Sequence, residues 1–372
     1  MRIDSSVRMQ VAVSLISRLN SRFCLPLFER CGGMEGFFLE SDRALDAVYR
    51  ELGVSARLFD RQKALREADR ELEQMDRQDI RICSVESDAY PELLRHCEDA
   101  PLVFYYRGDI RVVEKTVLLA IVGTRRASVR CREQVSAVVE ELARTGYDVV
   151  IVSGLAYGID AAAHRASLEC GLRTFAVLGH GLHMVYPAAH KNLAERILQA
   201  DGALISEFPC IAPVHPGNFL RRNRIVAGMC RATLVAESAE KGGAMSTARI
   251  AASYNRDVMA FPGRPDDRYS AGCNRLIKEN TAVLVDNVTD VLHLLGVPVA
   301  MPQPIPEIPG LFDTGDRAVV LLQLLEKTED VTADELIRLT SMPEGEVYAL
   351  LLQLELEGKV LALPGKRYAL RN

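Results

Sequence analysis

Short runs of β-branched and aliphatic residues alternate with stretches of helical length and spacing between residues 111 and 297. This alternation is typical of an α/β fold in which helices cover both faces of a doubly wound, mostly parallel sheet. The predicted strands are residues 117–122, 148–152, 174–178, 203–206, 233–236, 258–261 and 282–285. The predicted helices are residues 129–144, 159–169, 188–199, 222–229 and 246–255. Such sheets bind ligands beyond the carboxyl ends of their strands, so we expect the site at that edge.

Proline marks the end of this central segment. Five of the 16 prolines fall between residues 298 and 310, where closely spaced prolines favour an extended spacer. We therefore predict four parts: a helical domain at 1–79, the α/β domain at 80–297, a proline-rich linker at 298–310 and a separate domain at 311–372. Within the first part, residues 61–79 predict a solvated helix with Lys63–Glu67 and Glu73–Arg77 pairs four residues apart.

The last part has the order of a winged helix. Helical stretches at 314–327, 334–340 and 344–357 precede a strand, a Pro364-Gly365 turn and a final strand. Thr332 with Glu335, and Ser341 with Glu344, match the capping box that begins helices.

The third helix of this tail is acidic, whereas groove-reading helices of DNA-binding winged domains approach phosphates. It carries Glu344, Glu346, Glu355 and Glu357, with no lysine or arginine before Lys359. We interpret the tail as a protein-contact or regulatory domain, with DNA binding by this helix as the less favoured alternative.

Charge is distributed unevenly along the chain. The net charge is −5 overall, but residues 110–297 carry 22 basic against 18 acidic residues, while the segments on either side are net acidic. The central domain is therefore where an anion is expected to dock.

Other features narrow the class of protein. The apolar runs are far shorter than the roughly 20 residues that cross a bilayer, and the start lacks the pattern of a signal peptide, so we expect a cytoplasmic protein with no membrane partner. The nine cysteines form no C-x-x-C pair, which favours buried thiols over disulfides or a zinc site.

Two predicted strands end in loops suited to phosphate. The first is followed by Gly123 to Ser128, with Arg125 and Arg126, and then by a helix. The second is followed by Ser153 to Asp160, again with glycines ahead of a helix. Free N–H groups at a helix start and nearby arginines favour anions, although a turn that needs glycine for geometry alone remains an equal alternative.

The third strand leads into Gly179-His180-Gly181, but Met184 occupies the third glycine position of a dinucleotide fingerprint. Dinucleotide binding is therefore poorly supported. His180, His183, His190 and His215 lack carboxylates at the usual spacing, so we expect no metal.

Residues 219–224 form the densest basic cluster and are expected to open a helix. Arg221 and Arg224 would share one face while Arg222 points elsewhere. That face would grip phosphates while Phe219 offers a stacking surface, the alternative being a solvated basic helix end. Further small-residue loops at 241–247, 261–263 and 272–274 suggest a wide groove at the same edge, suited to a polymer of phosphates.

Catalytic templates are missing. The chain has no G-x(4)-G-K-[ST] loop and no G-x-S-x-G elbow, and we expect neither catalytic residues nor a cofactor.

Several motifs occur in the order found in one family. They are Val122 to Arg125, Ser153 to Asp160, Ala176 to Gly179, Tyr186-Pro187, Ser206-Glu207, Arg222 to Gly228, Pro262-Gly263 and Gly272 to Asn274. Across residues 80–290 the chain resembles the DNA-processing protein A (DprA/Smf) family. The resemblance implies an extended Rossmann-like domain between an N-terminal SAM-like helical domain and a winged helix. It also implies a non-enzymatic homodimer that binds and protects single-stranded DNA and loads RecA recombinase onto it during natural transformation.

Motif position then suggests the DNA-binding residues, with Arg125, Lys191, Arg222 and Arg224 as contacting cations. The full predicted set is Gly123, Thr124, Arg125, Arg126, Ser128, Ser153, Gly154, Gly158, Lys191, Phe219, Arg221, Arg222, Asn223, Arg224, Gly243, Ser246, Thr247 and Asn274.

Two alternatives remain. One is a nucleotide-hydrolysing protein related to phosphoribohydrolases, whose motif G-G-x-G-T-x-x-E, aligned from Gly242, meets Met245 and Arg249 where glycine and glutamate are needed. The other is a sensor of free nucleotides.

Overall fold

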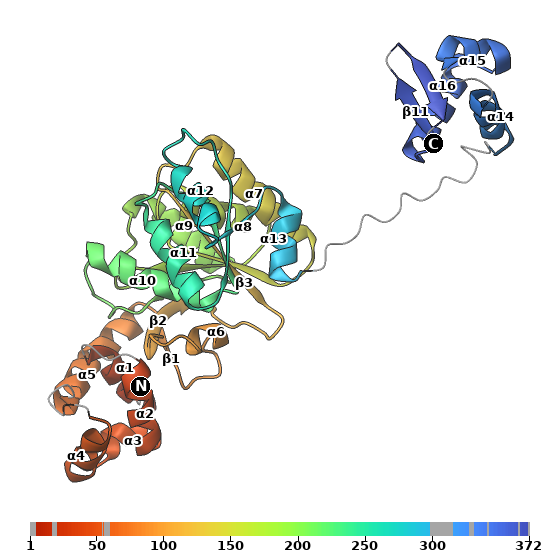
Figure 1. Ribbon diagram of the computed structural model, residues 1–372. Coiled ribbons are helices and arrows are strands. Elements are labelled where there is room, and N and C mark those ends of the chain that lie inside the picture. The colour runs from red at the N-terminus through yellow and green to blue at the C-terminus, as the bar shows by residue number, and fades with distance from the viewer. Residues whose placement is uncertain are drawn as a thin grey trace. The chain divides into compact units, whose positions relative to one another are not determined.

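The computed structural model describes residues 5–16, 21–53, 55, 60–297, 315–326, 331–340, 342–363 and 365–370. The chain divides into two compact units, residues 1–300 and 301–372 (Figure 1). The predicted linker at 298–310 lies outside the described residues, and the predicted boundary between residues 79 and 80 stays a prediction.

A nine-stranded sheet runs through the described part of the first unit, in the order β1-β2-β6-β5-β4-β3-β7-β8-β9. Pairs β1–β2 and β2–β6 are antiparallel, and the other pairs are parallel. The strands are β1 (Arg81–Ser84), β2 (Val103–Gly108), β3 (Val117–Gly123), β4 (Val149–Ser153), β5 (Thr174–Leu178), β6 (Ala203–Ser206), β7 (Ala232–Glu237), β8 (Asp257–Ala260) and β9 (Val283–Leu284). The predicted doubly wound, mostly parallel sheet is confirmed.

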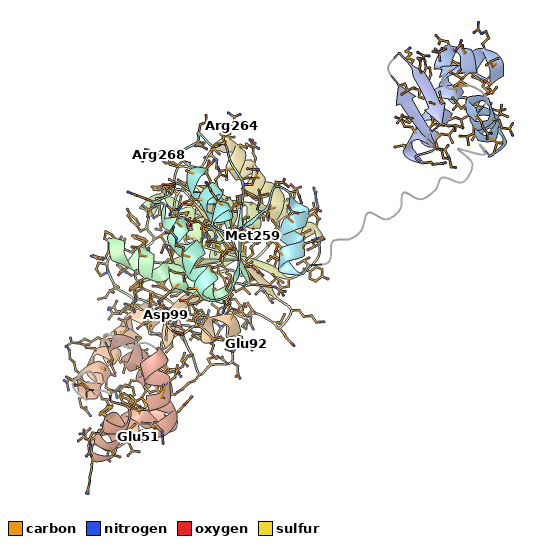
Figure 2. The ribbon with its side chains drawn as sticks, viewed as in Figure 1. Glu51, Glu92, Asp99, Met259, Arg264 and Arg268 are labelled. Carbon is orange, nitrogen blue, oxygen red and sulfur yellow. The ribbon has the colours of Figure 1, made fainter. Side chains whose placement is uncertain are left out.

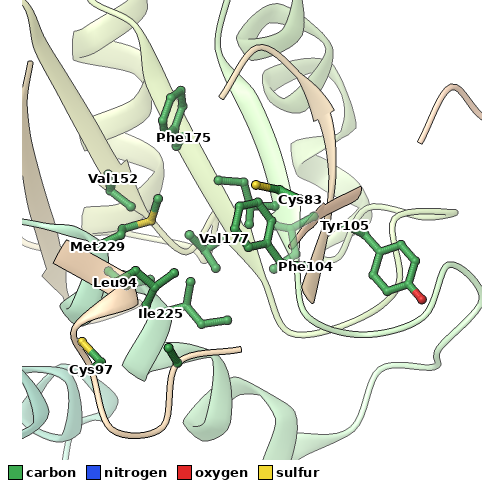
Figure 3. Packing of buried hydrophobic residues seen from close by; sticks show 14 of the residues in the cluster. Cys83, Leu94, Cys97, Phe104, Tyr105, Val152, Phe175, Val177, Ile225 and Met229 are labelled. Atoms are coloured by element: carbon green, nitrogen blue, oxygen red, sulfur yellow. The ribbon is translucent and has the colours of Figure 1, made fainter. Parts of the chain in front are cut away.

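Helices cover both faces of this sheet because its strands are apolar on both sides. Leu119 and Ile121 of β3 pack into one cluster with helices α7 (Val129–Arg144), α8 (Ile159–Glu169) and α13 (Val288–Leu295). Ala120 and Val122 belong to the opposite cluster, which includes residues of α10 (Pro216–Met229) and α11 (Gly243–Ser253). Figure 3 shows part of that second cluster, where Ile225 and Met229 of α10 lie near Val152 and Val177.

Four local predictions were wrong. The short strands β1 and β2 were not expected, because an antiparallel pair at the edge lacks the alternation with helices. Helix α10 begins at Pro216 rather than at residue 222, and His215 is its N-cap. Residues 272–274 form no loop at the sheet edge but the start of α12 (Ala271–Lys278). Of the predicted loop at 241–247, residues 243–247 are likewise helical and begin α11. The remaining helices of the central part are α6 (Glu92–Arg95), the 3-10 turn η2 (Ala188–His190) and α9 (Lys191–Gln199).

The first helices pack against the edge of this sheet. They are α1 (Ser5–Leu15), α2 (Ser21–Cys31), α3 (Met34–Leu39), α4 (Asp42–Glu51) and α5 (Arg61–Arg77). The Lys63–Glu67 and Glu73–Arg77 pairs are present, at 3.9 and 3.8 Å. However, α5 is not solvated all round: Ala64, Ala68, Glu71 and Met75 are buried.

Glu71 joins this helix to the central domain. Its side chain is buried, and its Oε1 accepts a hydrogen bond from the backbone N–H of Cys210. Nearby, the Tyr105 hydroxyl of β2 lies 2.6 Å from the Ser14 hydroxyl of α1. Burial raises the pKa of Tyr105 well above its usual range, so that phenol stays protonated.

The second unit is a winged helix. Its elements are α14 (Gly315–Glu326), β10 (Val331–Thr332), α15 (Ala333–Thr340), α16 (Glu344–Leu356), β11 (Val360–Leu363) and β12 (Arg367–Leu370), with the strands paired in the order β10-β12-β11. The Thr332–Glu335 capping box is confirmed by reciprocal bonds of 3.1 and 3.3 Å. Ser341 and Pro364 lie outside the described residues, and β10 was not predicted. None of the helices among the described residues is long and apolar enough to span a membrane.

We expect Glu71→Ala to lower the free energy of unfolding by about 1–3 kcal/mol, because the buried N–H of Cys210 loses its acceptor. Glu73→Ala is the matched control on the same helix: its pair with Arg77 is exposed and should contribute less than about 1 kcal/mol. Urea denaturation at neutral pH measures both. Equal stability of the two variants would contradict this role of Glu71.

Candidate nucleic-acid interface

A groove of about 750 Å³ opens at the carboxyl ends of β3, β4 and β7. The chain order reverses here, since β4 and β7 flank β3 on opposite sides, and such a switch point is where doubly wound sheets bind ligands. Four basic side chains line the groove and are exposed: Arg125, Arg126, Lys241 and Arg268. Arg268 lies with Arg264 at the opposite end of the unit from Glu51 (Figure 2). A fifth, Arg222, is buried, as is the only acidic lining residue among the described positions, Asp160.

The loop after β3 is fixed by β7. The backbone N–H of Thr124 donates to the Glu237 carbonyl at 2.7 Å, and that of Ser128 donates to Glu237 Oε2 at 2.8 Å. Ser128 then caps α7 by accepting from Cys131 N at 3.1 Å. These hydrogen bonds fix the backbone of the loop that carries Arg125 and Arg126.

Aromatic rings stand beside the first of these arginines. The Arg125 guanidinium carbon lies 5.8 Å from the Phe219 ring centroid, and the Tyr186 ring lies 5.9 Å from that of Phe219. A cation next to stacking surfaces suits a phosphate joined to a planar base.

Arg222 occupies the floor of the groove rather than its rim. Its Nη1 donates to the carbonyls of Gly154, at 2.9 Å, and Val177. Asp160 beside it accepts from the backbone N–H groups of Gly154 and Ala156 at 3.1 and 3.3 Å. Burial lowers the pKa of Arg222 and raises that of Asp160, while the opposite charge of each partner opposes those shifts.

Glycine is required at two points around this floor. A Cβ on Gly154 would overlap the Arg222 guanidinium. Gly158 has a φ of 76°, which disfavours other residues, and a Cβ there would overlap the Thr124 carbonyl.

Arg221 and Arg224 share a face, as predicted, because both pair with Glu207. The Arg221 nitrogen lies 3.1 Å from Glu207 Oε2, and Arg224 also donates to the Asp99 carbonyl. Burial raises the pKa of Glu207, and the two guanidiniums oppose that rise. The pair sits within α10 rather than at its start, and neither arginine lines the groove.

The groove gathers ten of the eighteen predicted residues. Those residues are Gly123, Thr124, Arg125, Arg126, Gly154, Phe219, Arg222, Asn223, Gly243 and Thr247, the last two lying in α11. Their contact with DNA stays a prediction.

Eight predicted residues are not brought to the groove. Ser153 is buried and donates to the Ile121 carbonyl at 2.6 Å, and Asn274 exchanges two hydrogen bonds with the Gly263 backbone. Lys191 lines a separate cavity beside Arg107 and Glu195. The others are Ser128, Gly158, Arg221, Arg224 and Ser246.

Several lining residues were missed by the sequence analysis. Tyr186 and Lys241 stood in quoted motifs but were not chosen as site residues, and Arg268 and Tyr269 follow β8 in a loop with no motif. A search for cations and aromatics near every predicted strand end would have found them.

Two of the histidines form hydrogen bonds with backbone carbonyls. Nδ1 of His183 lies 2.7 Å from the Cys210 carbonyl, and Nδ1 of His190 lies 2.8 Å from the Leu155 carbonyl. Among the described residues, no group of three or more His, Cys, Asp or Glu side chains is arranged to hold a metal ion.

Comparison with known proteins places this geometry in context. A family model described as DNA recombination-mediator protein A matches residues 81–296, and one described as DprA winged helix domain matches residues 304–366. The chain is 34% identical over 331 residues to Protein Smf of Synechocystis sp., which covers 81% of this chain and 82% of that relative. It is 41% identical over 210 residues to DNA processing protein DprA of Streptococcus pneumoniae, covering 56% and 72% of the two chains.

Two solved structures of DNA processing protein A are similar to this chain. The X-ray structure of DNA processing protein A from Streptococcus pneumoniae has a TM-score of 0.65 at 31% identity, covering 79% of this chain and 98% of that one. A structure describing the single-stranded DNA binding mode of DNA processing protein A from Helicobacter pylori has a TM-score of 0.52 at 28% identity, covering 58% and 95%.

Arg222→Ala should lower the free energy of unfolding by about 3–5 kcal/mol, because the buried Asp160 carboxylate loses its cation. Adding Asp160→Asn should recover part of that loss, since no unpaired charge then remains. Arg221→Ala, at an exposed neighbouring position, is the control. Chemical denaturation measures the free energy of unfolding of each variant. Equal values for Arg222→Ala and Arg221→Ala would contradict the stabilisation of buried Asp160 by Arg222.

Stability should also depend on pH through His164. Burial lowers the pKa of His164 to about 3, so it stays neutral in the folded protein. Below its ordinary pKa of about 6.5, only the unfolded chain takes up this proton, and stability falls by up to about 1.4 kcal/mol per pH unit. His164→Leu should flatten the decline between pH 6.5 and about 5. Denaturation at several pH values measures the slope of the free energy of unfolding against pH. The same slope for both proteins would show that His164 does not contribute to this pH dependence.

Proposed function

Because the chain belongs to the DNA recombination-mediator protein A family, as its motifs predicted, we propose that it binds single-stranded DNA in the groove and delivers that DNA to RecA recombinase. The observation that carries the first part is the placement of Arg125 over Phe219 at the mouth of a groove lined by further cations. The ligand named for the Helicobacter pylori relative supports the same substrate class.

The chemistry of the groove favours a flexible strand over a duplex. Unpaired bases expose their faces to Phe219 and Tyr186, whereas the bases of a duplex are stacked on each other. Exposed Arg125, Arg126, Lys241 and Arg268 supply the sequence-independent contacts to phosphates.

Delivery to RecA and homodimerisation are further parts of the proposal. The family description, a recombination mediator, supports the delivery step. RecA filament formation on single-stranded DNA covered by a single-strand-binding protein, followed with and without this protein, tests it. No acceleration of filament formation by a protein that binds the DNA would exclude delivery while leaving DNA binding intact. Sedimentation at several concentrations tests the dimer.

Nucleotide hydrolysis is less well supported. Arg249 is exposed on α11 at the position where the hydrolase motif needs glutamate, and Met245 is buried where that motif needs glycine. Release of ribose 5-phosphate from a nucleoside monophosphate, at a rate that follows the protein through purification, would favour the hydrolase instead.

Arg125→Ala should weaken binding of a labelled oligothymidylate about tenfold or more, because a charge-assisted contact to phosphate is lost. The slope of log affinity against log salt should become shallower by about 0.7. Arg144→Ala, at the far end of α7 and paired with Glu140 at 2.5 Å, is the control. Fluorescence anisotropy at several salt concentrations measures both; equal affinities would contradict the groove.

Removal of residues 311–372 should leave affinity for single-stranded DNA unchanged or slightly higher at low salt. Glu344, Glu355 and Glu357 are exposed in or next to α16, and Glu346 pairs with Arg317, so this helix presents negative charge to a polyanion. Anisotropy on the truncated protein measures the effect. A loss of more than about tenfold in a folded variant would make the winged helix a DNA-binding module.

A further inference from the structure

A second basic cavity, of about 420 Å³, lies next to the groove. It is bounded by the loop after β3, the first turns of α7 and the exposed side of α8. The side chains that define its chemistry are Arg125, Arg126, Arg132, Arg165, Tyr157 and His190. None of its lining residues, all within the described part of the chain, is acidic.

The arginines of this cavity are not neutralised by the protein. Arg132 and Arg165 are exposed, and neither forms a salt bridge among the described residues. By contrast, Arg144 at the other end of α7 pairs with Glu140. Four guanidinium groups around one cavity repel one another, and an anionic ligand would relieve this repulsion.

An aromatic ring is held at the same cavity. Tyr157 is 48% exposed, and its ring meets the buried His190 edge to face with centroids 4.9 Å apart. His190 is itself fixed, because its Nδ1 donates to the Leu155 carbonyl. Tyr157 is therefore held by its contact with the imidazole, while about half of its surface remains accessible to a planar group.

Arg125 and Arg126 line both the groove and this cavity, so they form the ridge between the two. We propose that the cavity binds the phosphodiester backbone of the same strand after it leaves the groove, with Tyr157 as a stacking surface for one base. This inference rests on the proposed function. It assigns Arg132 and Arg165 as contacts for internal phosphates.

The test compares two oligothymidylates, one of about 4 nucleotides that fills the groove alone and one of about 16 that also reaches the cavity. The variant is Arg132→Gln with Arg165→Gln. It should bind the longer strand about tenfold more weakly, with a salt slope shallower by about 1.4, since two phosphate contacts are lost. Its affinity for the shorter strand should match that of the unaltered protein.

Arg130→Gln with Arg196→Gln removes the same charge from exposed positions outside the cavity and should leave both affinities unchanged. Tyr157→Leu should weaken the binding of the longer strand and leave the affinity for the shorter strand unchanged. Thermal melting confirms that each variant is folded.

The outcomes separate the two proposals. If the unaltered protein binds neither strand, the proposed function fails. If it binds both and the Arg132/Arg165 variant binds the longer strand equally well, the cavity inference alone fails. If the Arg132/Arg165 variant loses affinity only for a strand that carries a 5′-phosphate, the cavity binds a terminal phosphate, and the proposed contact with internal phosphates is wrong.

Discussion

The buried guanidinium of Arg222 connects three segments that are distant in the sequence. It donates from α10 to the carbonyls of Val177 on β5 and Gly154 after β4, beside the carboxylate of Asp160 at the start of α8. A buried charge is tolerated only when it is paired and its hydrogen bonds are satisfied, so these segments must keep their relative positions. The floor of the groove is therefore set by the same contacts that stabilise the fold.

The rim of the groove depends on this floor. Phe219 lies three residues before Arg222 on α10, so anchoring Arg222 also places the Phe219 ring on a neighbouring part of the helix surface. Glu237 fixes the loop that brings Arg125 over that ring. With Arg222 and Arg224 engaged by the protein, the exposed cations are left to meet a ligand.

The sequence predicted the regular parts of this arrangement. Helices α7 and α8 have the predicted bounds, because their apolar spacing and start signals are local. The pairing of Arg224 with Glu207 was not predictable from local charge, since it depends on α10 crossing the end of β6. The burial of Arg222 was not predictable either, because it follows from tertiary packing. Its motif marked Arg222 as a site residue but did not show that its charge is used inside the protein.

Photo-crosslinking of an iodouridine-substituted single strand, with mass spectrometric mapping of the joined residues, tests the central claim most directly. The groove predicts crosslinks to Phe219 or Tyr186 that disappear when unlabelled single-stranded DNA competes and persist when duplex DNA competes. Crosslinks confined to residues 315–370, or crosslinks that duplex DNA removes equally well, would contradict it.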